Sequence, residues 1–223
     1  MLVRWSGAYA SASGGMTVPG QALRITVPAP SRVRPGRRLT DLRGRAVRTL
    51  SYPAGDVLVV SGLPGGGKST LMRRASGARL IDSQDVRLRW AARMPRRLPY
   101  AVYRPLVRIA HYAGMRRALR SGESVVVHDC GTLPWVRNWL ARQAARRGRG
   151  MHLLLLDVTE DAARDGQRSR GRGVSAYAMA RHRRASRRLL AAARAGGLPG
   201  ACVSTVLLDR AAARALDAIT FDV

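Results

Sequence analysis

A glycine-rich stretch from Ser61 to Thr70 has the residue types and spacing that hold phosphate groups. It reads Ser-Gly-Leu-Pro-Gly-Gly-Gly-Lys-Ser-Thr, and so contains a glycine, four residues, and then Gly-Lys-Ser. Glycines let the backbone curl so that several N–H groups point at one centre. We expect Lys68 to reach the β- and γ-phosphates of a nucleotide and the Ser69 hydroxyl to bind Mg²⁺. The predicted nucleotide-binding residues are Gly62, Leu63, Pro64, Gly65, Gly66, Gly67, Lys68, Ser69 and Thr70.

Lys68 is the only lysine among the 40 basic residues of the chain. A compact ammonium group fits beside phosphate groups where a planar guanidinium does not. A sequence that uses arginine almost everywhere else, and keeps lysine at this position, therefore favours a catalytic and nucleotide-binding role for Lys68.

Three carboxylates follow the second and third expected strands, at the edge of a parallel sheet where ligands bind. Asp129, which follows Val125–His128, is expected to hold Mg²⁺, although it could also cap the next turn. Asp85 is expected to orient an acceptor hydroxyl and accept its proton, with Asp82 as the competing candidate. Asp85 would also suit the N-cap of a helix over Val86–Met94, and in that alternative its role is only structural.

Two arginine-rich blocks accompany these residues. Residues 86–122 contain ten arginines and no carboxylate, which favours an anionic acceptor beside this insertion. The second block, residues 164–194, begins with guanidinium groups and glycines over residues 168–174, a combination typical of a lid that closes over ATP. We expect Arg168 to contact the nucleotide, and Arg168 and Arg172 to stabilise the transferring phosphoryl group. An exposed basic loop is the alternative.

Short apolar runs alternate with helical stretches from residue 57 onward, which predicts an α/β fold with a mainly parallel sheet. Continuous Val and Leu runs indicate strands that are covered on both faces. The five expected strands are Val57–Val60, Ala78–Ile81, Ser124–Val127, Met151–Leu156 and Val203–Leu208. A further short strand is expected at Arg45–Ser51, packed on the strand that follows it.

Composition divides the chain into two parts. Residues 1–50 are rich in Arg and Pro and predict a basic, largely disordered N-terminal arm, while residues 51–223 are expected to form one domain with a lid at about 160–175. No run is apolar and long enough to span a bilayer, so no membrane partner is expected. The two cysteines form no disulfide framework, which makes the cytoplasm the expected compartment.

The net charge of +27 favours polyanionic partners and leaves nucleic acid possible. A solvated basic surface is the alternative. Aromatic residues make up only 5% of the chain and form no visible stacking platform, which weakens the case for single-strand recognition.

From Val57 to about Leu190 the chain resembles the zeta-toxin and polynucleotide-kinase-like branch of the P-loop kinases. The matching pieces are Gly62–Thr70, Asp85–Arg87, Val125–Asp129 leading to Arg137, and Gln167–Val174. The resemblance implies a three-layer, nucleoside-kinase-like P-loop NTPase fold with a five-stranded parallel sheet and an Arg-rich lid. It also implies ATP, Mg²⁺ and phosphoryl transfer to a hydroxyl. The family's base is usually followed three residues later by Arg, where this chain has Leu88.

The leading functional hypothesis is a kinase that transfers the γ-phosphate of ATP to a hydroxyl of a small molecule or of a polynucleotide 5′ end. The alternative is an ATP-binding or ATP-hydrolysing regulatory NTPase that associates with nucleic acid and phosphorylates nothing.

Overall fold

The main sheet has six strands, and all its neighbouring pairs are parallel. The computed structural model describes residues 31–36, 39–129, 133–169, 171, 173–196 and 201–222. In spatial order the strands are β2 (Leu39–Asp41), β8 (Ser204–Leu208), β7 (Met151–Leu156), β4 (Val57–Gly62), β6 (Ser124–Asp129) and β5 (Ala78–Ile81). Five of them are the predicted strands. The parallel α/β fold is therefore confirmed, and β2 raises the strand count from the expected five to six.

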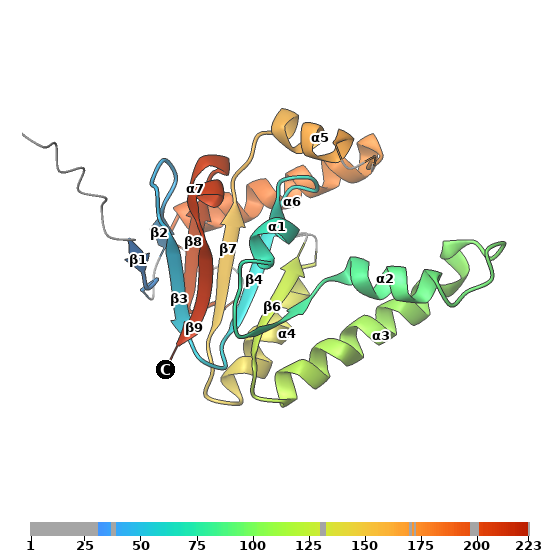
Figure 1. Ribbon diagram of the computed structural model, residues 1–223, viewed down its shortest axis with the longest axis horizontal. Coiled ribbons are helices and arrows are strands. Elements are labelled where there is room, and N and C mark those ends of the chain that lie inside the picture. Colours follow the sequence, from blue (N-terminus) through green and yellow to red (C-terminus); the bar gives the residue numbers. More distant parts are fainter. Residues whose placement is uncertain are drawn as a thin grey trace, which may run out of the picture.

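Helices and a small second sheet cover the two faces of this sheet, giving three layers (Figure 1). One core packs β4, β6 and β7 against α3 (Tyr100–Arg120), α4 (Pro134–Ala145) and α6 (Ala176–Arg194). The other core packs the opposite face against α1 (Lys68–Met72) and α7 (Arg210–Ala215). The central strands are continuous runs of Val and Leu because both of their faces are buried. The remaining helices are α2 (Ser83–Ala91) and α5 (Glu160–Arg168).

The second sheet contains β1 (Arg32–Val33), β3 (Thr49–Pro53) and β9 (Ala218–Asp222), in the order β1-β3-β9. Leu50 of β3 and Ile219 of β9 face each other in register and are fully buried. The strand expected at Arg45–Ser51 thus forms slightly later in the chain. It pairs with β1 and β9, and its Leu50 and Tyr52 share a buried core with Leu58 and Val60 of the strand that follows it.

Part of the segment expected to be a disordered arm is folded. Residues 1–30 and 37–38 lie outside the described residues, whereas 31–36 and 39–50 supply β1, β2 and the start of β3. Leu42, Val47 and Leu50 are 5% exposed or less and belong to the core beneath β8 and β9. Residues 39–50 are therefore part of the fold, and they include most of the segment in which a strand was expected at Arg45–Ser51. These three core positions were not recognised from the sequence because the residues around them are strongly basic.

The register of the parallel strands brings the candidate residues to one edge. Ser61 pairs with Asp129, and Ile81 pairs with Val127, so Asp82 lies level with His128 just past the strand ends. Gly62 pairs with Leu156 of β7. The carboxyl ends of β4, β5, β6 and β7 therefore converge where ligands bind in sheets of this kind.

A Ser–His–Asp arrangement occupies the opposite edge. His152 contacts Ser204 through Nδ1 at 2.7 Å and Asp56 through Nε2 at 2.8 Å. These three residues are 0–5% exposed, so no substrate can reach the Ser204 hydroxyl. We interpret the cluster as a buried hydrogen-bond network that joins β4, β7 and β8.

Candidate active site

The loop between β4 and α1 turns on glycines in conformations that other residues rarely adopt. Gly62, Gly65 and Gly67 have φ angles of +153°, +85° and +102°, so side chains at these positions would strain the backbone. Gly67 is the N-cap of α1, and the first amides of a helix have no acceptor within the helix. The loop therefore offers backbone donors to an anion at the carboxyl edge of the sheet.

Lys68 lies inside this loop and is only 4% exposed. Its Nζ donates to the carbonyl oxygens of Gly62 and Leu63, each at 2.8 Å. Two carbonyls that converge on one nitrogen suit a compact ammonium better than a planar guanidinium. The loop thus holds the positive charge where phosphate oxygens would lie.

Ser69 faces Asp82 beyond the end of β5. The Ser69 hydroxyl donates to Oδ2 of Asp82 at 3.3 Å, while Oδ1 accepts the amide of Gln84 at 2.9 Å and caps α2. Magnesium takes oxygen ligands from one or two side chains and completes its shell with water and phosphate oxygens. A hydroxyl and a carboxylate beside the phosphate loop are such a set, so these residues fit Mg²⁺. Among the described residues no larger cluster of metal-ligating side chains occurs.

Asp129, which was expected to hold Mg²⁺, forms an ion pair with an arginine. Its Oδ2 accepts from Nη1 of Arg137 at 2.7 Å, and Arg137 is 4% exposed. Removing one partner of such a buried ion pair strongly destabilises a protein, because the other charge is left uncompensated. The structure therefore brings Asp82, and not Asp129, to Ser69.

Asp85 lies away from this cluster. It is exposed in the first turn of α2, and its carboxylate makes no hydrogen bond or ion pair within the described part of the chain. A negative charge there supports the N-terminus of the helix. Asp82, the competing candidate, is the carboxylate that lies beside Ser69.

Two imidazoles border the same region. Burial, followed by the charge of Lys68, lowers the pKa of His128 to about 4, although Asp82 lies 3.7 Å from its Nδ1. Burial also lowers the pKa of His111 on α3, against the opposing charge of Asp82. Both rings are therefore neutral near pH 7, and each can donate one hydrogen bond and accept another.

A cavity of about 270 Å³ opens beside Asp129 and both imidazoles. Its floor is apolar and its rim carries Arg87, Arg104 and Arg108. The floor residues come from α3, β6 and α4 and are Val107, Met115, Val127, Val136 and Leu140. This cavity adjoins the insertion for which the sequence predicted an anionic acceptor.

A second cavity, of about 260 Å³, follows the other side of the phosphate loop. Gly65, Gly66 and Gly67 line it together with apolar residues of the β7–α5 connection, and Arg210 and Arg214 of α7 face it. The phosphate loop thus borders a site large enough for part of a nucleotide.

The predicted lid contacts the phosphate loop through residues other than the expected arginines. Gly166 of α5 packs on Gly65 so closely that a Cβ on Gly166 would lie 2.2 Å from the Gly65 oxygen. Gln167 Nε2 donates to the carbonyl of Pro64 at 2.9 Å. Arg168 points outward, is paired with Asp165 at 2.5 Å and has a 77% exposed side chain. Arg172 lies outside the described residues.

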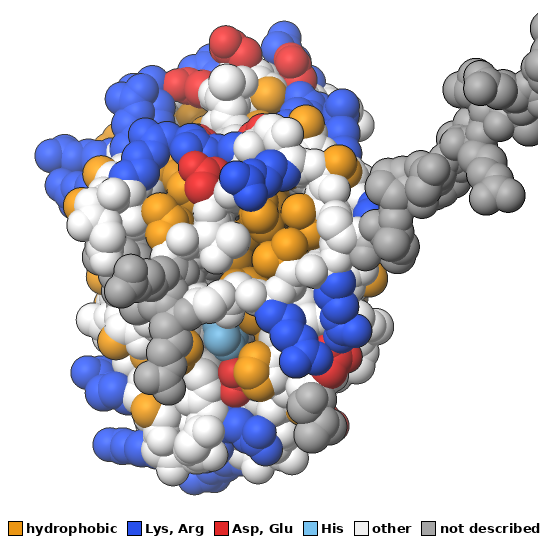
Figure 2. All heavy atoms as spheres, turned by 90° about the vertical axis from the view of Figure 1, so that its left-hand side faces the viewer, with side chains coloured by type: hydrophobic (Ala, Val, Ile, Leu, Met, Phe, Trp, Pro, Cys, Tyr) orange, Lys and Arg blue, Asp and Glu red, His pale blue; other side chains and the backbone are white. Residues whose placement is uncertain are grey.

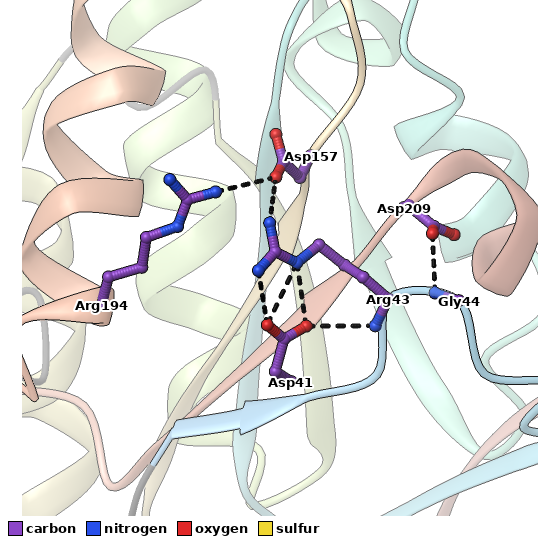
Figure 3. A network of polar contacts seen from close by, with 6 residues as sticks. All are labelled: Asp41, Arg43, Gly44, Asp157, Arg194 and Asp209. Atoms are coloured by element: carbon purple, nitrogen blue, oxygen red, sulfur yellow. Dashed lines mark hydrogen bonds and ion pairs between the residues drawn. The ribbon is translucent and has the colours of Figure 1, made fainter.

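The segment after β2 closes the same edge of the sheet over β7 and β8 (Figure 3). Arg43 pairs with Asp41 at 2.5 Å and with Asp157, which follows β7, at 2.9 Å. The Gly44 amide donates to Asp209, the N-cap of α7, at 2.7 Å. The hydrogen bonds from Arg43 lower the pKa of Asp41. These partly exposed pairs fix the segment in place while adding about 1 kcal/mol or less each.

Groups of basic side chains stand out on the surface. On the face that lies at the left of Figure 1, blue side chains surround an apolar area, with only a few carboxylates among them (Figure 2). The described residues include no helix with the length and apolarity to cross a membrane.

A buried lysine in a glycine loop between a parallel strand and a helix, beside a hydroxyl and a carboxylate, defines a P-loop nucleotide-binding protein. The model of the AAA domain family matches residues 57–195. The chain belongs to this P-loop kinase-like family. No curated protein matches it. The narrower resemblance to zeta toxins and polynucleotide kinases stays a prediction.

Proposed function

We propose that the protein is an ATP-dependent kinase that transfers the γ-phosphate to a hydroxyl of an acceptor bound in the cavity beside Asp129. One observation carries this proposal. Gly65, Gly66 and Gly67 of the phosphate loop line one cavity, and His128 lines a separate one. Asp82 lies between the two sets of residues, because its carboxylate accepts from the Ser69 hydroxyl at 3.3 Å and lies 3.7 Å from Nδ1 of His128. An NTPase needs room for a nucleotide and water, whereas a kinase needs a second shaped site for its acceptor.

Each residue then has a role that its contacts support. Lys68 and the loop amides hold the β- and γ-phosphates, and Ser69 with Asp82 holds Mg²⁺, which neutralises charge on the transferring group when bound. Asp129 borders the acceptor cavity, where it orients the hydroxyl and accepts its proton while Arg137 fixes its carboxylate. This differs from the sequence expectation, which gave Mg²⁺ to Asp129 and the acceptor hydroxyl to Asp85, with Asp82 as the competing candidate.

The lid has a separate role in this proposal. Arg168 has to leave Asp165 before it can reach a phosphoryl group, so its contribution depends on closure of the segment over residues 160–175. Gln167 and Gly166 already rest on the phosphate loop and form the pivot for that closure.

A regulatory NTPase associated with nucleic acid is the second candidate, and the net charge of +27 favours it. The two functions separate when the protein is incubated with Mg²⁺ and γ-labelled ATP against pools of oligonucleotides, nucleosides, sugars and small alcohols. The kinase proposal expects label on an acceptor, and expects Asp129→Asn to abolish transfer while ATP binding persists. Label that reaches only free phosphate refutes it in favour of the NTPase.

A further inference from the structure

The cavity beside Asp129 carries an excess of positive charge. Four guanidinium groups line it, those of Arg87, Arg104, Arg108 and Arg137. Asp129 is the one carboxylate among the described residues that line it. Burial lowers the pKa of His111 and of His128, so both rings are neutral near pH 7 and do not alter this balance. Clefts lined by charges of one sign concentrate ligands of the opposite sign.

Three of these guanidinium groups have no carboxylate to balance them. Arg137 is paired with Asp129 at 2.7 Å. Arg87, Arg104 and Arg108 make no ion pair within the described part of the chain. They belong to the segment of residues 86–122, which contains no carboxylate. The wall formed by α2 and α3 therefore has guanidinium donors available to an anion.

The guanidinium groups lie along one face of α3. Tyr100, Arg104, Arg108 and Tyr112 follow one another at intervals of four residues, and all of them line the cavity. Residues four apart in a helix lie one above the other on the same face. Arg87 of α2 joins this face, because its guanidinium carbon lies 4.5 Å from the centroid of the Tyr100 ring. A contact with the face of a ring positions a guanidinium group without using its N–H donors.

Tyr112 connects this face with Asp129. Burial raises the pKa of Tyr112, the charge of Arg108 lowers it, and the charge of Asp129 also raises it. Both charges thus lie near the same side chain of the cavity wall. A ligand whose hydroxyl lies at Asp129 can therefore extend past Tyr112 and place an anionic group at Arg108 and Arg104.

Polar side chains border the space between these two ends. Ser83 and Gln84 lie at the start of α2, and Tyr100 and Tyr112 add two phenol groups. These side chains donate and accept hydrogen bonds, which suits a body that carries several hydroxyl groups. The volume of about 270 Å³ lies just below the range of roughly 300–1,000 Å³ typical of drug-sized ligands, so the cavity suits a small molecule.

We propose that the acceptor is a small polyol or sugar that carries a phosphate group, with its reacting hydroxyl at Asp129 and its phosphate at Arg104 and Arg108. This inference rests on the proposed kinase function and names its acceptor class. A phosphate monoester is favoured over a carboxylate, because its about two negative charges and three free oxygens can engage several guanidinium groups at once.

The reaction at this acceptor is a simple displacement. The hydroxyl oxygen forms a bond to the γ-phosphorus of ATP, and the bond from that phosphorus to the bridging β–γ oxygen breaks. ADP leaves, and the hydroxyl proton passes to Asp129. The product carries two phosphate groups.

Matched probes measure the contribution of the phosphate group without relying on catalysis. Ribose 5-phosphate is compared with ribose, and glycerol 3-phosphate with glycerol. Dissociation constants are measured by ligand-observed NMR at constant ionic strength, with Mg²⁺ and a saturating non-hydrolysable ATP analogue that keeps the probes out of the phosphate loop. We expect each phosphate ester to bind about tenfold or more tightly than its parent, the factor expected for one charge-assisted hydrogen bond.

Variants of α3 locate the effect. Arg104→Gln and Arg108→Gln each remove one guanidinium group from the cavity wall, so each should reduce the preference for the phosphate ester, and both together should abolish it. Arg116→Gln makes the same change on the same helix outside the cavity and is the matched control, which should leave the preference unchanged. All three arginines are exposed, so the variants should fold, and thermal unfolding verifies this.

The inference is wrong if the phosphate esters bind no better than their parents, if neither cavity substitution reduces the preference, or if Arg116→Gln reduces it equally. It is also wrong if a 5′-hydroxyl oligonucleotide displaces ribose 5-phosphate and loses affinity in the two cavity variants but not in Arg116→Gln. That result would assign the cavity to polynucleotide ends.

Failure of the proposed kinase function gives a different pattern. The preference for phosphate esters would then appear as expected, while γ-labelled ATP releases label only as free phosphate in the presence of sugar phosphates. Label that reaches only acceptors without a phosphate group would support the kinase function and overturn the inference about its acceptor.

Discussion

Replacing Gly166 with alanine tests whether α5 rests on the phosphate loop as the structure shows. Gly166 lies within α5, where helix propensity alone predicts that alanine stabilises the protein by about 1 kcal/mol. Packing predicts the reverse, because the new Cβ would lie 2.2 Å from the Gly65 oxygen. Real Cβ atoms essentially never approach closer than 3.0 Å, so α5 must move away from the loop by about 0.8 Å.

The two effects have different signs and can be weighed. Forcing an extra methyl group into a close contact costs about 1–3 kcal/mol, which exceeds the propensity gain. The displacement also stretches the hydrogen bond between Gln167 and Pro64, worth about 1 kcal/mol. We therefore expect a net destabilisation of about 1–2 kcal/mol, which lowers Tm by roughly 2–8 °C in a domain of this size.

Thermal unfolding followed by circular dichroism, with binding of a fluorescent ATP analogue, measures both consequences. Gly173→Ala is the matched control, because a Cβ there meets nothing within 4 Å and its backbone does not need glycine. The control should change Tm by less than Gly166→Ala and leave nucleotide affinity unchanged. A Gly166→Ala protein with raised Tm and unaltered affinity would show that α5 does not rest on the loop.

The remaining predictions concern the site. Lys68→Ala should weaken ATP binding about tenfold or more, the loss of one charge-assisted bond, and Lys68→Arg should not restore it, as isothermal titration would show. Asp82→Asn should raise the Mg²⁺ concentration needed for nucleotide binding, whereas Asp85→Asn should not; the opposite pattern would refute the metal role proposed for Asp82. Because the fold lowers the pKa of His128 to about 4, the unfolded chain binds more protons between pH 6.5 and 4. The free energy of unfolding should therefore fall as pH falls through this window, by up to about 1.4 kcal/mol per pH unit, and denaturant titration of His128→Asn should show a weaker dependence.

The elements that sequence reasoning found are those with a strong local signal. The continuous apolar runs of β4, β7 and β8 could form only buried strands, and the glycine loop fixed the position of α1. Of the second sheet only β3 was expected, because β1 and β9 are short and contain Arg, Thr and Asp. The pairing of β3 with β9 joins positions 49 and 218, and no local pattern reports a contact over that separation.

Within the candidate site, the segments named from the sequence do contact the phosphate loop, but the contacts come from Asp82 and Gln167. Asp82 and Asp85 both suit the start of α2, and only the register of β5 against β6 places Asp82 beside Ser69. Gln167 and Arg168 are neighbours on a helix and so point about 100° apart. Arginine was the more obvious chemical choice, yet Gln167 faces the loop. The polarity of Gln167 and its place beside Gly166 were the available signal.

The distribution of carboxylates explains why the type of a residue at a strand end does not settle its role. The chain has only 13 acidic residues, yet β5, β6, β7 and β8 each end at or just before an aspartate. Asp82 and Asp129 lie beside the phosphate loop and the acceptor cavity, whereas the aspartates after β7 and β8 hold the segment around Arg43. The same side chain at the same edge thus holds structure together at one end of the sheet, whereas at the other end we propose a chemical role for it. Asp82 and Asp129 also accept from a backbone amide and a guanidinium, so what separates them from the other two is an additional neighbour, the Ser69 hydroxyl for Asp82 and the cavity for Asp129.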